Sequence, residues 1–237
     1  MKTKPVAIAG NGYKLSGTLV IPDTTPNNLP AVVFYHGMVS KSKPRYVRRA
    51  KALAKEGIVG LCFDFRGCGG SDGKLGEISM AQWLDDALLA YHYLTNQPFV
   101  DKERLGIAGK SFGGYMAALV SEKQKVTSMV LQAPAVYPDS WFDKPYTATG
   151  DVAKQRLEYR KSSNALNNKA IRAIKQYKNP LLVIGSELDE ICPRQVVEGY
   201  FQSAASTTKK VRWIKGADHS LRDEKHNQEY TEMMVYW

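Results

Sequence analysis

The distribution of apolar residues along the chain predicts strands that alternate with helices. Eight short runs have the length and composition of β-strands: residues 6–8, 14–21, 31–35, 58–63, 104–108, 126–131, 180–184 and 210–214. Asn-Gly between the first two runs is typical of a hairpin. The run at residues 31–35 is continuously apolar, as expected of a strand that is buried on both faces of a sheet.

Between these runs, apolar residues recur at the spacing of a helix. This spacing predicts helices over 44–56 and 79–95, one after residue 111, one between the last two strands, and one from about residue 223. Strands alternating with helices imply a mostly parallel sheet that is covered on both faces. The predicted fold class is therefore α/β, with about eight strands.

The alternation is interrupted between residues 134 and 179. This segment has no strand-like run; aromatic residues come first, and a basic helical stretch over residues 152–177 follows. We interpret it as a small helical lid insertion after the sixth strand, within a single domain that spans residues 1–237. We expect a lid in this place to set substrate specificity.

A Gly-Lys-Ser-Phe-Gly sequence at residues 109–113 lies between the fifth strand and a predicted helix. Strand, G-x-S-x-G and helix together describe a nucleophile elbow, a tight and strained turn that exposes a serine hydroxyl. Glycine is needed at Gly109 and Gly113 because a side chain would collide across the turn. The alternative is a Gly-rich loop with an incidental serine, but the flanking elements favour Ser111 as a nucleophile.

Composition narrows the classes of function. The 237-residue chain is 43% hydrophobic and has no apolar run of membrane-spanning length and no signal peptide pattern. Its three cysteines, Cys62, Cys68 and Cys192, form no C-x-x-C pair, which argues against disulfides and zinc and suits the cytoplasm.

The formal net charge is +10, from Lys and Arg residues that are scattered, with local density only over 41–49 and 154–178. Neither stretch matches a nucleic-acid-binding module, so we expect no nucleic-acid partner and no membrane partner. We interpret the charge as a solvated basic surface, with attraction of anionic substrates as the alternative.

Five motifs lie at strand ends: His36-Gly37, Asp64-x-Arg66-Gly67-x-Gly69, the elbow, Gly185-x-x-x-Asp189-x-x-x-Pro193 and Gly216-Ala217-Asp218-His219. In order and placement they resemble the motifs of the α/β-hydrolase superfamily over essentially the whole chain. The set is most similar to small esterases of the dienelactone-hydrolase and feruloyl-esterase-like groups. The elbow also resembles that of prolyl-oligopeptidase-type catalytic domains, although this chain has no room for the β-propeller of those peptidases.

A serine nucleophile needs a base that takes its proton during attack. Of the four histidines, His219 follows the last strand, from where a loop can reach Ser111. His92 is expected to pack in a helix, His226 to face solvent, and His36 to shape its own loop.

The base needs an acid that orients it and stabilises its charged form. Asp189 follows the seventh strand and gives the order Ser, Asp, His that the resemblance implies. Glu187, Glu190 and Asp218 are rival candidates.

The resemblance also implies an oxyanion hole made of the backbone N–H groups of Met38 and Phe112. Aromatic residues of the lid, Tyr137, Trp141 and Phe142, are candidates for substrate binding. The alternative for Trp141 and Phe142 is that they only anchor the lid to the core.

The sequence therefore predicts a serine carboxylesterase that acts through an acyl-enzyme on short or aromatic carboxylic esters, with thioesters as an alternative. No metal and no organic cofactor is implied, and the partner is a small-molecule ester bound by a monomer or homodimer. Two other hypotheses remain open: an aminoacyl or small-peptide hydrolase, and a non-catalytic binding protein on the same fold.

Overall fold

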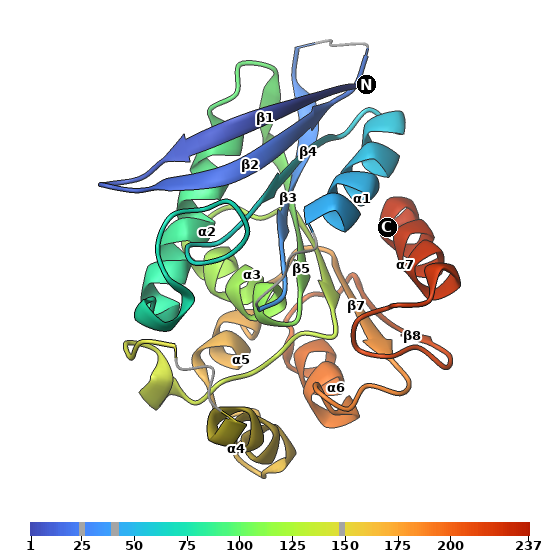
Figure 1. Cartoon of the computed structure of the whole chain (residues 1–237). Coiled ribbons are helices and arrows are strands. Elements are labelled where there is room, and N and C mark those ends of the chain that lie inside the picture. The colour runs from blue at the N-terminus through green and yellow to red at the C-terminus, as the bar shows by residue number, and fades with distance from the viewer. Residues whose placement is uncertain (24–26, 39–42, 147–149) are drawn as a thin grey trace.

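A computed structural model describes residues 1–23, 27–38, 43–146 and 150–237 (Figure 1). The eight strands form one sheet in the order β1-β2-β4-β3-β5-β6-β7-β8. Their bounds are β1 Lys2–Ala9, β2 Lys14–Ile21, β3 Leu29–Tyr35, β4 Val59–Phe63, β5 Val100–Lys110, β6 Ser128–Gln132, β7 Leu181–Ser186 and β8 Lys209–Ile214. The β1–β2 and β2–β4 pairs are antiparallel, and the other five pairs of neighbouring strands are parallel. The predicted mostly parallel sheet of eight strands is confirmed.

Helices cover both faces of the sheet, as predicted. They are α1 Lys43–Lys55, α2 Met80–Thr95, α3 Phe112–Lys123, α4 Gly150–Lys161, α5 Lys169–Ile174, α6 Arg194–Ser203 and α7 Glu224–Tyr236, with short 3-10 turns at Leu75–Glu77 and Asp139–Trp141. The buried residues of α2, α3, α5 and α6 form one apolar core, and those of α1 and α7 form a second.

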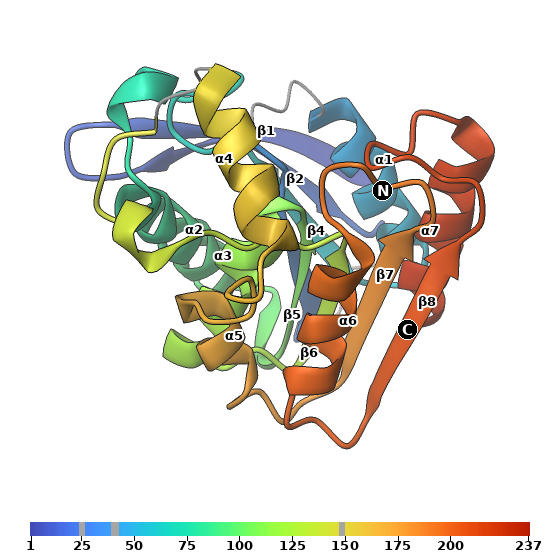
Figure 2. The same cartoon turned by 90° about the horizontal axis from the view of Figure 1, so that it is seen from below.

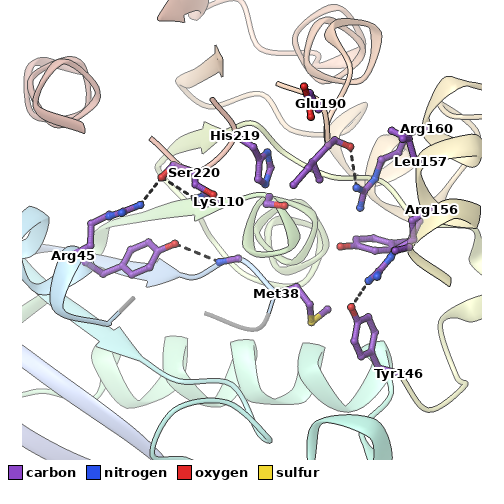
Figure 3. A pocket seen from close by; sticks show the side chains of 16 residues that line it. Met38, Arg45, Lys110, Tyr146, Arg156, Leu157, Arg160, Glu190, His219 and Ser220 are labelled. Atoms are coloured by element: carbon purple, nitrogen blue, oxygen red, sulfur yellow. Dashed lines mark hydrogen bonds between the residues drawn. The ribbon is translucent and has the colours of Figure 1, made fainter. Parts of the chain in front are cut away.

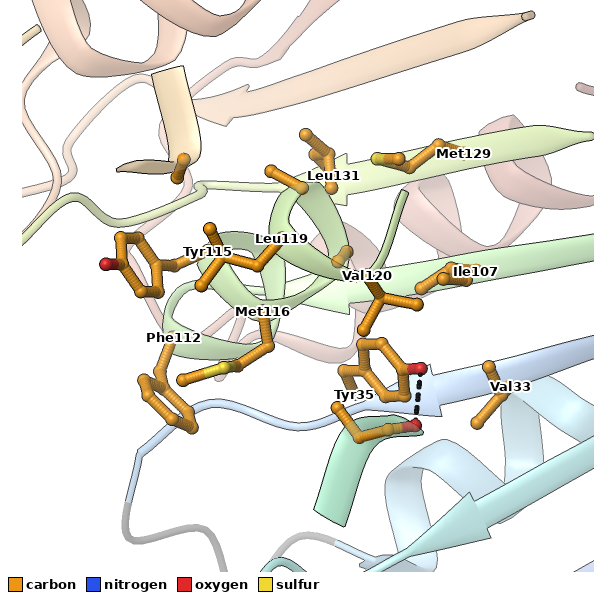
Figure 4. Close-up of a cluster of buried hydrophobic side chains, with 14 of the residues drawn as sticks. Val33, Tyr35, Ile107, Phe112, Tyr115, Met116, Leu119, Val120, Met129 and Leu131 are labelled. Carbon is orange, nitrogen blue, oxygen red and sulfur yellow. Dashed lines mark hydrogen bonds between the residues drawn. The ribbon is translucent and has the colours of Figure 1, made fainter. Parts of the chain in front are cut away.

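The strands contribute side chains to both cores, because successive side chains along a strand point to opposite faces of the sheet. In β3, Tyr35 belongs to the first core and Phe34 to the second. Figure 4 shows the first core around α3, where Leu119 and Val120 lie near β-strand residues such as Ile107. This packing fixes α3, and with it the turn that precedes α3.

A buried hydrogen bond adds to this packing. The Tyr35 hydroxyl donates to the carbonyl oxygen of Ala87 in α2 at 2.9 Å (Figure 4). A buried hydroxyl needs such a partner, since leaving it unpaired costs about 1–3 kcal/mol. The bond ties the centre of the sheet to the helix beside it.

The segment over 134–179 lies between β6 and β7 and is helical, but its basic stretch is not one helix. It divides into α4 and α5, and the Asn168 side chain caps α5 by accepting a hydrogen bond from the N–H of Ile171 at 3.2 Å. Helix α5 packs on α3 and α6, within the first core. Helix α4 lies beyond the carboxyl ends of the parallel strands (Figures 1 and 2).

Candidate active site

Ser111 lies in the turn between β5 and α3, as the motif predicts. Its φ angle of 51° is in the left-handed region, which is strained for a residue with a side chain. The surrounding backbone holds it there: its N–H donates to the Gln132 oxygen at 2.9 Å, and its oxygen accepts from the N–H groups of Gly114 and Ala135. The residue is 7% exposed.

The two glycines of the elbow are required by close contacts between backbones. A Cβ atom on Gly113 would lie 2.0 Å from the carbonyl oxygen of Tyr35, and one on Gly109 would lie 2.5 Å from the oxygen of Gly113. Backbone atoms of packed strands and helices cannot move aside. The predicted reason for glycine at both positions is confirmed.

His219 and Asp189 meet at the carboxyl edge of the sheet. The Nδ1 atom of His219 lies 2.8 Å from Oδ2 of Asp189, and Oδ1 of Asp189 accepts hydrogen bonds from the N–H groups of Ile191 and Cys192 at 2.9 and 2.8 Å. The side chains are 12% and 3% exposed. Asp189 is therefore a buried carboxylate with both oxygens in use, and it fixes the orientation of the His219 ring.

The rival carboxylates bond elsewhere. Glu187 accepts from the N–H of Gly216 at 2.8 Å, Asp218 pairs with Arg222, and Glu190 is exposed. None of these bonds reaches His219, so Asp189 is the carboxylate that orients the ring.

The electrostatic surroundings of His219 favour its charged form. Burial lowers its pKa, but the hydrogen bond that His219 donates to Asp189, the contact with the Cys192 thiol and the charge of Asp189 together raise the pKa to about 9. A base in this setting accepts a proton readily.

Ser111 and His219 line the same cavity, which has a volume of about 640 Å³. Met38 and Tyr137 also line it, and Figure 3 shows His219 and Met38 on opposite sides of it. Trp141 and Phe142 do not line this cavity. Trp141 lines a smaller one of about 150 Å³, and the Phe142 ring lies 5.0 Å from the Lys169 ammonium.

Phe112 is the first residue of α3, and its backbone N–H therefore has no acceptor within the helix. Met38 ends the described part of the loop after β3. The neighbouring Gly37 donates its N–H to the Tyr46 hydroxyl at 3.3 Å. Residues 39–42 lie outside the described residues, and the two-donor oxyanion hole stays a prediction.

Four cationic side chains line the cavity and were not predicted as site residues: Arg45, Lys110, Arg156 and Arg160. Burial, with the nearby charges of Arg49 and Arg45, lowers the pKa of Lys110 to about 8. For Arg45, Arg156 and Arg160 the available signal was the density of Lys and Arg over 41–49 and 154–178, which we interpreted as solvated surface, with attraction of anionic substrates as the alternative. Among the described residues, no group of His, Cys, Asp and Glu side chains is arranged to hold a metal ion.

Residues 44–237 match the prolyl oligopeptidase family. The chain belongs to this family. Together with the sheet order, the match confirms the α/β-hydrolase fold and identifies the protein as a hydrolase.

Among individual relatives, an uncharacterized protein of Mycobacterium tuberculosis is 27% identical over 212 residues, which cover 89% of this chain and 69% of that protein. The mitochondrial palmitoyl-protein thioesterase ABHD10 of Bos taurus is 31% identical over 115 residues, which cover 45% of this chain and 33% of the thioesterase.

A similar solved structure is that of Est1E from Butyrivibrio proteoclasticus with bound ferulic acid. It has a TM-score of 0.77 and 20% identity, and the match covers 98% of each chain. At this identity the likeness concerns the fold, and it agrees with the resemblance to feruloyl-esterase-like enzymes. No helix in the described part of the chain is both long and apolar enough to cross a membrane.

Proposed function

We propose that the protein hydrolyses carboxylic esters of short or aromatic groups, with Ser111 as nucleophile, His219 as base and Asp189 as the orienting acid. The observation that carries this proposal is the 2.8 Å contact between His219 Nδ1 and Asp189 Oδ2, in a cavity that the strained Ser111 also lines. With the Nδ1 proton donated to Asp189, the other ring nitrogen, Nε2, has a lone pair for the serine proton.

The reaction follows from these roles. The Ser111 oxygen attacks the ester carbonyl carbon while His219 takes the hydroxyl proton, and the carbonyl oxygen gains negative charge. The N–H groups of Phe112 and Met38 stabilise that charge. His219 then gives its proton to the departing alcohol, which leaves an acyl group on Ser111. A water molecule, deprotonated by His219, attacks the acyl-enzyme and releases the acid.

The size and lining of the cavity support a small substrate. Its volume of about 640 Å³ is in the range of small-molecule sites, and Met38, Tyr137, Leu157 and Ile191 give it apolar surface. Ferulic acid, bound in the Est1E structure, is an aromatic acid of suitable size. The name of the thioesterase relative supports thioesters as additional substrates.

The family match favours a second candidate, hydrolysis of aminoacyl or small-peptide amides. The same triad serves both reactions, because amide and ester cleavage pass through the same type of tetrahedral intermediate. The two candidates differ in the leaving group that the cavity accepts, so they are separated by substrate and not by mechanism.

The first experiment compares p-nitrophenyl acetate, butyrate and octanoate with an aminoacyl p-nitroanilide, using wild type, Ser111→Ala and Ser121→Ala. Ser121 lies on α3 outside the cavity and is the matched control. We expect wild type and S121A to cleave the shorter esters and S111A to be inactive. Faster cleavage of the anilide than of every ester would favour the amide candidate. Equal activity of S111A and wild type would exclude Ser111 as nucleophile.

A further inference from the structure

The cavity beside Ser111 has an excess of positive charge. Arg45, Lys110, Arg156 and Arg160 line it, and Glu190 is its one lining carboxylate among the described residues. The ion pairs recorded among the described side chains include none of these four cations. Their charges face a space that a substrate would fill.

Helix α4 presents two of these cations on its cavity-facing side. Ala153, Arg156, Leu157 and Arg160 line the cavity, at spacings of three, one and three residues, which places them on one face of the helix. A face of this spacing that covers a protein interior is normally apolar. Here half of its positions are arginine, and Figure 3 shows Arg156 and Arg160 together on one side of the cavity.

Arg160 is 4% exposed and has only neutral hydrogen-bond partners recorded for its guanidinium. It donates to the carbonyl oxygens of Val136 and Ile191 at 3.4 and 3.0 Å, and it lies 5.1 Å from the centre of the Tyr137 ring. Asp189 attracts it, but both oxygens of Asp189 already accept hydrogen bonds. A buried charge without a direct counter-ion is costly, so this position favours an anion from outside the chain.

Arg156 is suited to contact that anion. Its guanidinium donates to the Tyr146 hydroxyl and lies 5.1 Å from the centre of the Tyr146 ring, which orients it at the cavity wall. A guanidinium has five donors in a planar fork, and it binds carboxylate or phosphate through two of them at once. The remaining cations, Arg45 and Lys110, both approach the Ser220 oxygen, at 2.5 and 3.5 Å, on the other side of the cavity (Figure 3). They add to the positive potential that attracts anions.

We propose that the substrate is an ester that carries an anionic oxyacid group, a carboxylate or a phosphate, which Arg156 and Arg160 of α4 bind. This inference rests on the proposed ester hydrolysis and names its substrate class. The anionic group lies on the α4 side of Ser111, so it selects substrates by binding and takes no part in bond cleavage.

Two matched pairs of esters test the proposal. In the first, p-nitrophenyl pentanoate and p-nitrophenyl hydrogen glutarate share the leaving group and the length of the acyl chain, and only the second carries a carboxylate. In the second, phenyl acetate and 4-acetoxybenzoate place the carboxylate on the leaving group. We expect kcat/KM for the anionic member of at least one pair to be about tenfold higher or more, as a charge-assisted hydrogen bond allows.

The variants are Arg156→Gln and, as matched control, Lys154→Gln, which removes an exposed charge from the same helix outside the cavity. R156Q should lower the ratio of anionic to neutral kcat/KM about tenfold, mainly through KM, and K154Q should keep the ratio. The proposal is overturned if neither pair favours the anionic member, or if R156Q and K154Q have the same ratio.

If wild type hydrolyses no ester, the proposed function fails, and the anion site is tested by binding alone. Isothermal titration of wild type and R156Q with glutarate and with inorganic phosphate should show tighter binding to wild type. Binding of phosphate without glutarate would identify a phosphate-bearing ligand, and the reverse a carboxylate. No difference between the two proteins for either anion would overturn the site.

Discussion

The imidazole of His36 accepts a hydrogen bond from the backbone N–H of Phe65, with 2.9 Å between Nε2 and the amide nitrogen. Its Nδ1 atom lies 2.7 Å from the oxygen of Gly37. Burial lowers the pKa of His36, which keeps the ring neutral and lets one nitrogen accept while the other donates. One side chain thus joins the loop after β3 to the loop after β4, which is the structural role predicted from the sequence.

Replacing His36 should therefore destabilise the fold. In His36→Ala the N–H of Phe65 loses its acceptor in a buried place, and we expect the free energy of unfolding to fall by about 2 kcal/mol. Urea denaturation followed by circular dichroism measures this. The control is His92→Ala. His92 was expected to pack, but it is exposed on α2, so this change should alter stability by less than about 0.5 kcal/mol. Equal stability of the two variants would contradict the role given to His36.

The close contacts of the elbow predict that adding a single methyl group at Gly113 strongly destabilises the fold. In Gly113→Ala the new Cβ atom would meet the Tyr35 oxygen at 2.0 Å and the His36 oxygen at 2.7 Å, both backbone atoms. We expect a loss of about 3 kcal/mol or more, measured by thermal unfolding. Gly76→Ala is the matched control, because its nearest contact would be an ordinary 3.7 Å. A G113A variant as stable as G76A would show that the strand and helix can separate.

Much of this architecture could be predicted because its causes are local in the sequence. Strands such as β3 and β7 are buried on both faces and are therefore continuously apolar, and the elbow needs glycine at fixed positions. The choice of Asp189 over Glu187 and Asp218 had to stay open. All three follow the last two strands, and only the folded loops determine which carboxylate reaches His219.

The cavity wall could not be predicted for a similar reason. Arg156 and Arg160 lie in a basic stretch that, by composition, is typical of a solvated surface, and only the docking of α4 turns this face toward Ser111. Conversely, Trp141 and Phe142 have the aromatic character of pocket residues, yet they lie outside the cavity and pack against the core. Their part in substrate binding stays a prediction.

Two substitutions at Met38 test the oxyanion hole, because they distinguish the contribution of the side chain to activity from that of the backbone N–H. Met38→Pro removes the N–H that we propose as a donor, and loss of one such donor lowers kcat by about 10²–10³. Met38→Ala keeps the N–H and should keep kcat within about tenfold of wild type, since the side chain contributes only to the cavity wall. Esterase kinetics with unfolding temperatures for both variants check this. If M38A and M38P lose the same activity at similar stability, the backbone of Met38 is not a donor.

The contact between His219 and Asp189 predicts an alkaline rise in activity. A base must be unprotonated to accept the serine proton, and the pKa of His219 is raised from 6.5 to about 9. The reactive fraction of His219 therefore grows as pH rises toward about 9, and kcat/KM for a neutral ester should increase over that interval.

The variant Asp189→Asn tests the cause of this raised pKa, because in it the His219 ring loses its carboxylate partner. The pKa of His219, followed by NMR titration, should then fall, while kcat falls by about 10⁴, as in comparable triads. Cys192→Ala removes only the thiol contact and should lower the pKa of His219 with the carboxylate still in place. An activity profile that is flat above pH 7, with an unchanged His219 pKa in D189N, would show that Asp189 does not control the base.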